Sequence, residues 1–295
     1  MSSEAVEDVW QRQSVWSQSA GQAKKAVNRS FTLVLGLVVL AAVLGASSAQ
    51  AQSGHPGPAR WLAVTAAVAV AVTPLARRGS AADAVMAWVR IRAVSEALKA
   101  DVYLFLASAG PFTGPDRAAL LRDRADELLE AARDLSDRTL AFPPRTRPLP
   151  AVTGPESYFT ERVDRQVREY YRPGAVKASR RLDRTRRAEL LLGLGAAVLA
   201  GVGASGVAAA TVWVGVLTTV AAAVTAHLAS TRLEFLHLEY SRVASELARL
   251  SARANDPGAD LPDLIGRCEQ VIATQNSTWV AKWTADDAPQ ETAAS

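Results

Sequence analysis

The chain has 295 residues, and its 33 Lys and Arg residues against 29 Asp and Glu residues give a formal net charge of +4 at pH 7. The single cysteine, Cys268, excludes an intramolecular disulfide and a zinc site built on several cysteines. The three histidines, His55, His227 and His237, lack the spacing of a helical metal pair, so we expect no metal site.

Long uncharged runs are the main feature of the sequence. Residues 31–49 and 61–76 carry no charged side chain, and His227 is the only ionisable residue between positions 191 and 231. A bilayer core needs about 20 apolar residues per helix, and the last run is long enough for two helices. We therefore expect four membrane-spanning helices, paired in chain order as two hairpins.

The first run also imitates a signal peptide, because Ala49-x-Ala51 follows it as a cleavage site would. Residues 1–30, with the acids Glu4, Glu7 and Asp8, precede the run, whereas the charged region of a signal peptide is short and basic. We expect this segment to remain as a membrane span.

The charged stretches between the spans show helical periodicity. Gly110-Pro111 ends the helix that follows the first hairpin, and the proline-rich residues 142–154 are predicted to form an extended linker. In chain order we expect helices at residues 4–29, 82–107, 116–140, 156–171, 232–254 and 260–283, with turns between spans at residues 50–60 and 203–206 and a disordered tail after residue 285.

The chain carries one unit twice. Each copy has a basic stretch, an apolar hairpin and then a helix with an Arg-x-x-Ser-Glu element. The fold class that we expect is an all-α membrane protein with two tandem two-span hairpins and a cytoplasmic helical bundle built by both copies. The duplicated elements are Arg92, Ser95 and Glu96 in the first copy and Arg242, Ser245 and Glu246 in the second.

These duplicated elements are the candidate site residues that the repeat supplies. Arg at position i and Glu at position i+4 share one helix face, which predicts an intrahelical ion pair worth roughly 0.3–0.5 kcal/mol when exposed. Because the element stands just beyond each hairpin, we expect it to lock the helix there against its neighbours. A ligand-binding or gating role is the alternative.

Basic residues gather at four membrane ends, while the two loops between spans carry only Arg60. The positive-inside rule therefore places both loops outside and both termini in the cytoplasm, in a multi-pass protein of the cell membrane. Anionic lipid headgroups are the expected partners of these charges, and nucleic acid is not, because no reader module accompanies them. The basic residues are Lys24, Lys25 and Arg29 before the first span, Arg77 and Arg78 after the second, seven between Arg172 and Arg187 before the third, and Arg232 after the fourth.

Patterns of catalytic residues are missing from the sequence. Gly193-x-Gly195 and Gly201-x-Gly203 lie inside an apolar run, where glycines permit close helix approach, and they do not follow a strand as a phosphate-binding loop does. No Ser, His and acid are arranged as a recognisable triad. We expect no enzyme activity and no cofactor. One chain also lacks the buried charges of a transporter, although several subunits together could enclose a pathway.

Polar residues recur every fourth position where the second copy begins. They are followed by a second tyrosine, the basic helix, the hairpin, the Arg-x-x-Ser-Glu element and a closing Glu-Gln-Val-Ile-x-x-x-Asn-x-x-Trp motif at residues 269–279. This pattern resembles the SLATT families, the SMODS- and SLOG-associating two-transmembrane effector domains of bacterial conflict systems. The first copy, about residues 9–140, resembles a more divergent SLATT unit. The recurring residues are Tyr158, Arg162, Gln166 and Tyr170, of which the last three join the candidate structural or gating residues.

The resemblance implies a membrane effector that works as a homo-oligomer. In such a system a nucleotide-producing or nucleotide-sensing partner triggers a pore that kills or arrests an infected cell. No fused sensor domain is visible, so we expect a separate nucleotide-signalling partner. The alternative is a membrane-anchored scaffold or sensor whose cytoplasmic bundle binds a partner protein. The expected domains are 1–141, a first SLATT-like unit; 142–154, a linker; 155–284, a second SLATT-like unit; and 285–295, a disordered tail.

Overall fold

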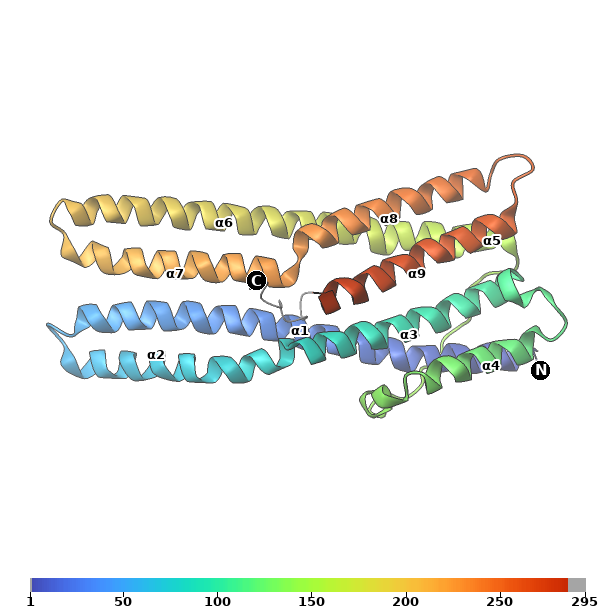
Figure 1. Ribbon diagram of the computed structural model, residues 1–295, viewed down its shortest axis with the longest axis horizontal. Coiled ribbons are helices and arrows are strands. Elements are labelled where there is room, and N and C mark those ends of the chain that lie inside the picture. The colour runs from blue at the N-terminus through green and yellow to red at the C-terminus, as the bar shows by residue number, and fades with distance from the viewer. Residues whose placement is uncertain (1, 286–295) are drawn as a thin grey trace, which may run out of the picture. The chain divides into compact units, whose positions relative to one another are not determined.

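The computed structural model describes the backbone of residues 2–285 and the side chains of residues 3–275. The expected tail and the side chains of Asn276 and Trp279 lie outside these ranges. Every regular element within the described backbone is helical, which confirms the all-α prediction (Figure 1). The α-helices are α1 (Ser2–Ala51), α2 (Pro56–Arg77), α3 (Ala82–Ala107), α4 (Arg117–Glu130), α5 (Pro155–Tyr158), α6 (Arg172–Ala204), α7 (Ala208–Thr231), α8 (Leu233–Arg253) and α9 (Leu261–Ala285).

Five shorter helical elements lie between these helices. Three are 3₁₀ turns, and two are π-helical turns that continue from α5 into α6. The 3₁₀ turns are η1 (Arg78–Ser80), η2 (Gly110–Thr113) and η3 (Arg133–Arg138), and the π-helical turns are η4 (Phe159–Asp164) and η5 (Val167–Tyr171).

The chain forms two compact units, and each takes segments from both halves of the sequence. The bundle unit comprises Met1–Lys25, Ala82–Ala175 and Leu238–Ser295, and the hairpin unit comprises Ala26–Ala81 and Val176–His237. The boundaries expected at residues 141 and 155 describe the repeat along the chain and are not the boundaries of these compact units.

In the hairpin unit, the apolar parts of α1 and α2 pair side by side, and so do those of α6 and α7. The Ser48 hydroxyl donates a hydrogen bond to the Ala59 carbonyl at 2.8 Å near the α1–α2 turn. The Thr225 hydroxyl of α7 donates to the Glu189 carboxylate of α6 at 2.6 Å. Gly206, in a left-handed conformation with φ of 104°, provides the turn before α7 where a turn was expected.

The surface of the hairpin unit is apolar. Four helices are long and apolar enough to cross a membrane, and large side chains on them are exposed. Trp61 of α2 is 74 % exposed and Leu191 of α6 is 67 % exposed. A soluble protein rarely exposes a continuous apolar surface of this kind, because the exposure to water is unfavourable. The hairpin unit is therefore built for a hydrocarbon environment, and the chain is a membrane protein.

Both hairpins are followed by a break in the helix. After α2, η1 leads to Ala81, whose backbone is extended, and α3 begins at Ala82 as expected. After α7, Arg232 adopts the left-handed conformation with φ of 49°, which is unfavourable for a residue with a side chain, and α8 follows. In both copies the helix is thus interrupted just after the hairpin, by a 3₁₀ turn and an extended residue in the first copy and by a left-handed residue in the second.

The bundle unit packs its helices around α3. Side chains are buried around most of the circumference of α3, and its neighbours within the unit include α4, α5 and α9. The proline-rich linker is extended, as expected, and lies on α1: the Trp10 indole donates to the Pro148 carbonyl at 3.0 Å. The core includes Val9, Ile91, Leu98, Val102, Leu121, Val163, Leu247, Leu250 and Ile265.

The predicted helix over residues 116–140 is wrong at its C-terminal end. Helix α4 ends at Glu130, and the chain tightens into η3. Two tertiary contacts account for this change: Leu135 is buried, and the Asp134 carboxylate receives two hydrogen bonds from the Arg90 guanidinium at 2.6 and 2.8 Å. Continuing the α-helix would rotate both side chains away from these partners.

Candidate functional site: a buried polar cluster in the bundle unit

The four-residue spacing of the motif at the start of the second copy is matched by an unusual helix. The π-helical turns η4 and η5 lie within the segment that carries Tyr158, Arg162, Gln166 and Tyr170. Residues four apart drift around an α-helix because it has about 3.6 residues per turn. A π-helix bonds i to i+5 and has more residues per turn, so π-helical turns reduce the drift. They help to keep the motif directed toward the interior of the bundle unit.

Arg162 forms the most deeply buried ion pair. Its side chain is 1 % exposed, and its Nε and Nη2 atoms donate to the two carboxylate oxygens of Glu269 on α9 at 2.9 and 3.1 Å. The Tyr158 hydroxyl donates to the same carboxylate at 2.8 Å. The guanidinium also lies over the Tyr103 ring of α3, 4.8 Å from its centroid. The ion pair is thus removed from water and also contacts the Tyr158 hydroxyl and the Tyr103 ring. Removing one of its two charges is therefore expected to lower the free energy of unfolding strongly.

Arg92, from the first duplicated element, joins the cluster from α3. Its Nη2 donates to the Tyr170 hydroxyl at 2.7 Å, and that hydroxyl lies 3.2 Å from the hydroxyl of Tyr240 on α8. The rings of Tyr170, Tyr171 and Tyr240 meet edge to face. A side chain of the first copy is therefore bound directly to residues of the second.

Glu96 lies on α3 between these two groups. Its carboxylate is 3.8 Å from the Lys99 ammonium, and its side chain is 22 % exposed. Burial acts to raise the pKa of Glu96, but Lys99, Arg162 and Arg92 outweigh it, so the pKa is below the ordinary value. Glu96 is accordingly an anion among three cations at neutral pH.

Comparison with known families covers most of the chain. Residues 158–279 match the family model described as SMODS and SLOG-associating 2TM effector domain 1, SLATT_1. We call residues 158–279 the SLATT domain, after the family model that they match. Residues 14–119 match a different model, a protein of unknown function, DUF4231. Searches of the curated proteins and of the solved structures gave no match.

The two matched segments each contain one hairpin and the whole of the helix after it, α3 in one and α8 in the other. The SLATT domain supplies Arg162, Gln166, Tyr170 and Glu269 to the polar cluster, and the DUF4231 segment supplies Arg92 and Glu96. The cluster therefore joins the SLATT domain to the preceding half of the chain within one compact unit.

In both Arg-x-x-Ser-Glu elements, the described hydrogen bonds and ion pairs go to residues other than the partner four positions away, although the charge of Arg92 still lowers the pKa of Glu96. In the first element Arg92 contacts Tyr170 and Glu96 approaches Lys99. In the SLATT domain Arg242 binds Glu239 through two hydrogen bonds of 2.7 and 3.1 Å, and Glu246 binds Arg249. Partners three residues away and hydroxyls from other helices thus replace the partner four residues away.

The two serines of the duplicated elements have different environments. Ser95 is buried and accepts a hydrogen bond from the Gln13 amide of α1 at 3.0 Å, whereas Ser245 of the SLATT domain is exposed. Gln13 in turn receives a hydrogen bond from Arg147 of the linker. The first element is thus part of the interior, and the second lies on the surface of the bundle unit.

Replacing Ser95 with valine is expected to lower the free energy of unfolding by about 1–3 kcal/mol, because it adds volume to a packed site and removes one of the two acceptors of the Gln13 amide, leaving only the Ser95 carbonyl at 3.3 Å. Ser245→Val is the matched control: it has the same intrinsic helix cost at an exposed position, so we expect a change within about 0.5 kcal/mol. Denaturant unfolding in mild detergent, followed by circular dichroism, measures both. Equal losses for the two variants would contradict the assignment of interior and surface.

Several buried polar atoms of the SLATT domain have no hydrogen-bond partner within the described residues. Both amide atoms of Gln275, a 0 % exposed side chain, are unpaired, as are Oε1 of Gln166 and Nη1 of Arg162. The Gln166 amide nitrogen donates to the Tyr171 hydroxyl at 3.4 Å. Buried polar groups without a partner cost free energy unless water or another side chain satisfies them.

The cluster is suited to holding helices together rather than to bond chemistry. The one thiol, Cys268, is fully buried, and burial raises its pKa to about 12, so it is not an activated nucleophile. No group of His, Cys, Asp and Glu within the described residues could hold a metal ion. What the geometry offers is an ion and tyrosine network that links α3, the α5–α6 segment, α8 and α9.

Sequence reasoning missed several members of this network as site residues. Glu269 and Tyr158 were visible in the family pattern, but their pairing with Arg162 depends on the tertiary fold. Lys99 and Gln13 belonged to no motif, and only the position of Lys99 three residues after Glu96 could have drawn attention to it. Tyr240 stands two residues before Arg242 and could have been found by that proximity.

Proposed function

We propose that this protein is a membrane effector that acts as a homo-oligomer and opens a pore in a bacterial cell membrane, within a nucleotide-linked conflict system directed against phage. The observation that carries the proposal is the SLATT domain, a two-transmembrane effector domain, in a chain with four helices able to span a membrane. Its hairpin follows without interruption from the polar cluster, because η5, which contains Tyr170, runs directly into α6.

The oligomer is proposed because one chain does not enclose a pathway. Between 6 % and 11 % of the residues in each apolar window are buried inside the chain, so most of the apolar surface is left for lipid or for other copies. Several copies around an axis would convert exposed helix faces into a wall. Assembly of copies is also a step that a trigger can control.

The bundle unit is proposed to receive the trigger. Arg92, Glu96 and Arg162 lie in a network that ties both halves of the chain together, and α1 and α6 each continue from that unit into an apolar span. A partner that makes or senses nucleotides, acting on the cytoplasmic side, would alter this network. The basic flanks of the spans would bind anionic headgroups, and no catalytic step or cofactor is required.

Dye release from vesicles tests this function. Purified full-length protein is reconstituted in vesicles of phosphatidylethanolamine and phosphatidylglycerol loaded with carboxyfluorescein, and cyclic and linear nucleotides are added one at a time. We expect release with at least one nucleotide, rising steeply with protein density because several copies are needed. Intact vesicles with every nucleotide, from protein shown by cross-linking to be oligomeric, would contradict the proposal.

A second candidate is a membrane-anchored scaffold or sensor. It is favoured by the buried ion pairs and tyrosine hydrogen bonds of the bundle unit, since the spans carry mainly apolar side chains. Replacing residues 190–231 with an unrelated two-span hairpin separates the two candidates. A scaffold retains partner binding and cellular function after this exchange, whereas a pore-forming effector loses dye release and protection of the cells.

A further inference from the structure

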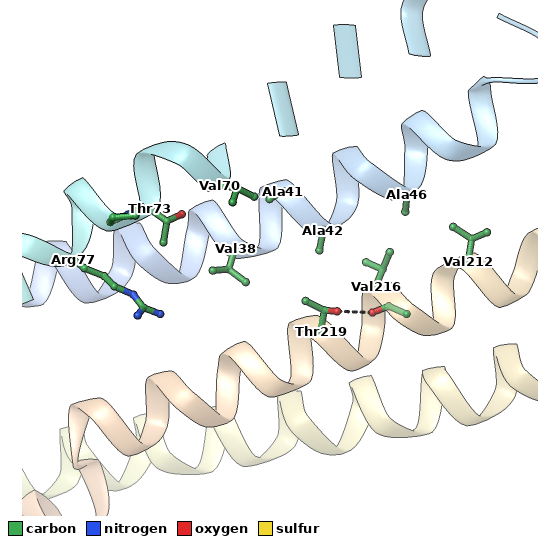
Figure 2. A pocket seen from close by; sticks show the side chains of 12 residues that line it. Val38, Ala41, Ala42, Ala46, Val70, Thr73, Arg77, Val212, Val216 and Thr219 are labelled. Atoms are coloured by element: carbon green, nitrogen blue, oxygen red, sulfur yellow. Dashed lines mark hydrogen bonds between the residues drawn. The ribbon is translucent and has the colours of Figure 1, made fainter. Parts of the chain in front are cut away.

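Two adjacent cavities of about 800 and 830 Å³ lie in the hairpin unit, between the α1–α2 pair and α7. They share Val38, Pro74, Arg77 and Thr219 as lining residues, so they form one groove. Figure 2 shows side chains of α1 and α7 facing each other across the first cavity. We call this space the hairpin groove.

The walls of the hairpin groove are apolar and small. Ala42 and Ala46 of α1 face Val212 and Val216 of α7 (Figure 2). The hydroxyl of Thr219 is bonded within its own helix, to the Gly215 carbonyl at 2.7 Å. Thr73, on α2, is bonded in the same way to Ala69 at 2.8 Å. The groove therefore offers hydrocarbon walls without free hydrogen-bonding groups, which suits an acyl chain and not a column of water.

Charge is confined to one end of the groove. Arg77 lines both cavities and Arg78 lines the second, together with Ser80, His227 and Ser230. Neither arginine side chain has a hydrogen bond or ion pair with the part of the chain that the structure describes, and no acidic residue lines either cavity. In Figure 2 the Arg77 side chain extends from α2 toward the space above α7. This end is a site for an anion.

The length of the groove suits an acyl chain. Its lining residues on α1 run from Phe31 to Ala46, about 22 Å at a rise of roughly 1.5 Å per residue. The hydrocarbon core of a bilayer is about 30 Å thick. One leaflet accounts for half of that thickness, about 15 Å, so the groove is long enough for an acyl chain that enters at Arg77.

We propose that the hairpin groove binds one anionic glycerophospholipid, with an acyl chain along α1 and α7 and the phosphate at Arg77 and Arg78. Two guanidinium groups without an internal counter-ion favour a net negative headgroup over a zwitterionic one, and arginine binds phosphate through two parallel hydrogen bonds. A helix of a second copy in the same orientation would bring its own basic flank to this end, where it would meet like charge. The lipid site does not depend on pore formation.

Lipid retention measured by native mass spectrometry tests the site. Delipidated full-length protein is incubated with palmitoyl-oleoyl phosphatidylglycerol or with the phosphatidylcholine of the same chains. We expect the wild type to keep one phosphatidylglycerol per chain and to prefer it to phosphatidylcholine. Replacing both arginines (Arg77→Gln with Arg78→Gln) should reduce that preference about thirtyfold, given roughly 1 kcal/mol for each of the two basic residues near an anionic surface.

Ala42→Phe fills the groove and should abolish retention of either lipid. Two controls should behave as the wild type: Arg122→Gln removes an exposed charge of α4, away from the basic flanks, and Ala67→Phe enlarges an exposed alanine of α2 outside the groove. Unchanged preference in the double arginine variant, or full retention in Ala42→Phe, would overturn the proposal. So would a change of oligomer mass in Ala42→Phe with lipid retention intact, since a second copy would then be the occupant.

Discussion

Replacing Glu269 with alanine is expected to lower the free energy of unfolding of the bundle unit by about 3–5 kcal/mol, because it leaves a buried guanidinium without its counter-ion. Arg162 is 1 % exposed and loses both carboxylate contacts, and the Tyr158 hydroxyl loses its acceptor. Cys268, the neighbouring residue on α9, is fully buried and is the only thiol. Its rate of reaction with a maleimide under native conditions therefore reports opening of this unit, and we expect the rate to rise about a hundredfold or more.

Two further variants serve as controls for this prediction. Glu246→Ala breaks the exposed pair with Arg249 and should cost less than about 1 kcal/mol, since surface ion pairs contribute little. Replacing both members of the buried pair, Arg162→Met with Glu269→Leu, should recover much of the loss because no uncompensated charge remains. If Glu269→Ala cost no more than Glu246→Ala, the buried pair would not be what holds α9 in place.

The apolar spans could be predicted from the sequence because their signals are local, whereas the two compact units, each of which takes segments from both halves of the chain, could not. Uncharged runs of sufficient length identify the four apolar helices, and glycine or proline residues mark most of the breaks between helices. The extended linker and the helix at residues 82–107 were predicted for the same reason. The prediction failed where a tertiary contact determines the backbone conformation. The helix expected to reach residue 140 ends at Glu130, because Leu135 is buried in the bundle unit.

The candidate site was predicted only in part, because its residues were found but not their partners. Arg92 and Arg162 were identified from the repeat and the family pattern. The spacing of Arg92 and Glu96 predicted a contact within one helix, yet the Tyr170 hydroxyl on another element binds Arg92. The π-helical turns were not predicted either, since the residues at positions 159, 163, 166 and 170 recur at i, i+4, i+7 and i+11, which fits an α-helical period.

The repeat itself has a consequence for function that the sequence did not reveal. The first Arg-x-x-Ser-Glu element lies in the interior, with Ser95 bonded to Gln13, and the second presents Ser245 on the surface. Two copies of one unit have therefore taken different roles within a single bundle.

The proposed function requires that both hairpins cross the bilayer and leave the bundle unit in the cytoplasm, and cysteine labelling of intact cells measures this directly. In a Cys268→Ser background, single cysteines are placed by Ser53→Cys in the turn between α1 and α2 and by Thr146→Cys in the linker. Both positions are exposed. We expect a membrane-impermeant maleimide to label Ser53→Cys in intact cells and Thr146→Cys only after the cells are permeabilised, as the basic flanks at four membrane ends predict. Labelling of Thr146→Cys but not of Ser53→Cys would reverse the orientation, and labelling of both in intact cells would contradict the four-span arrangement.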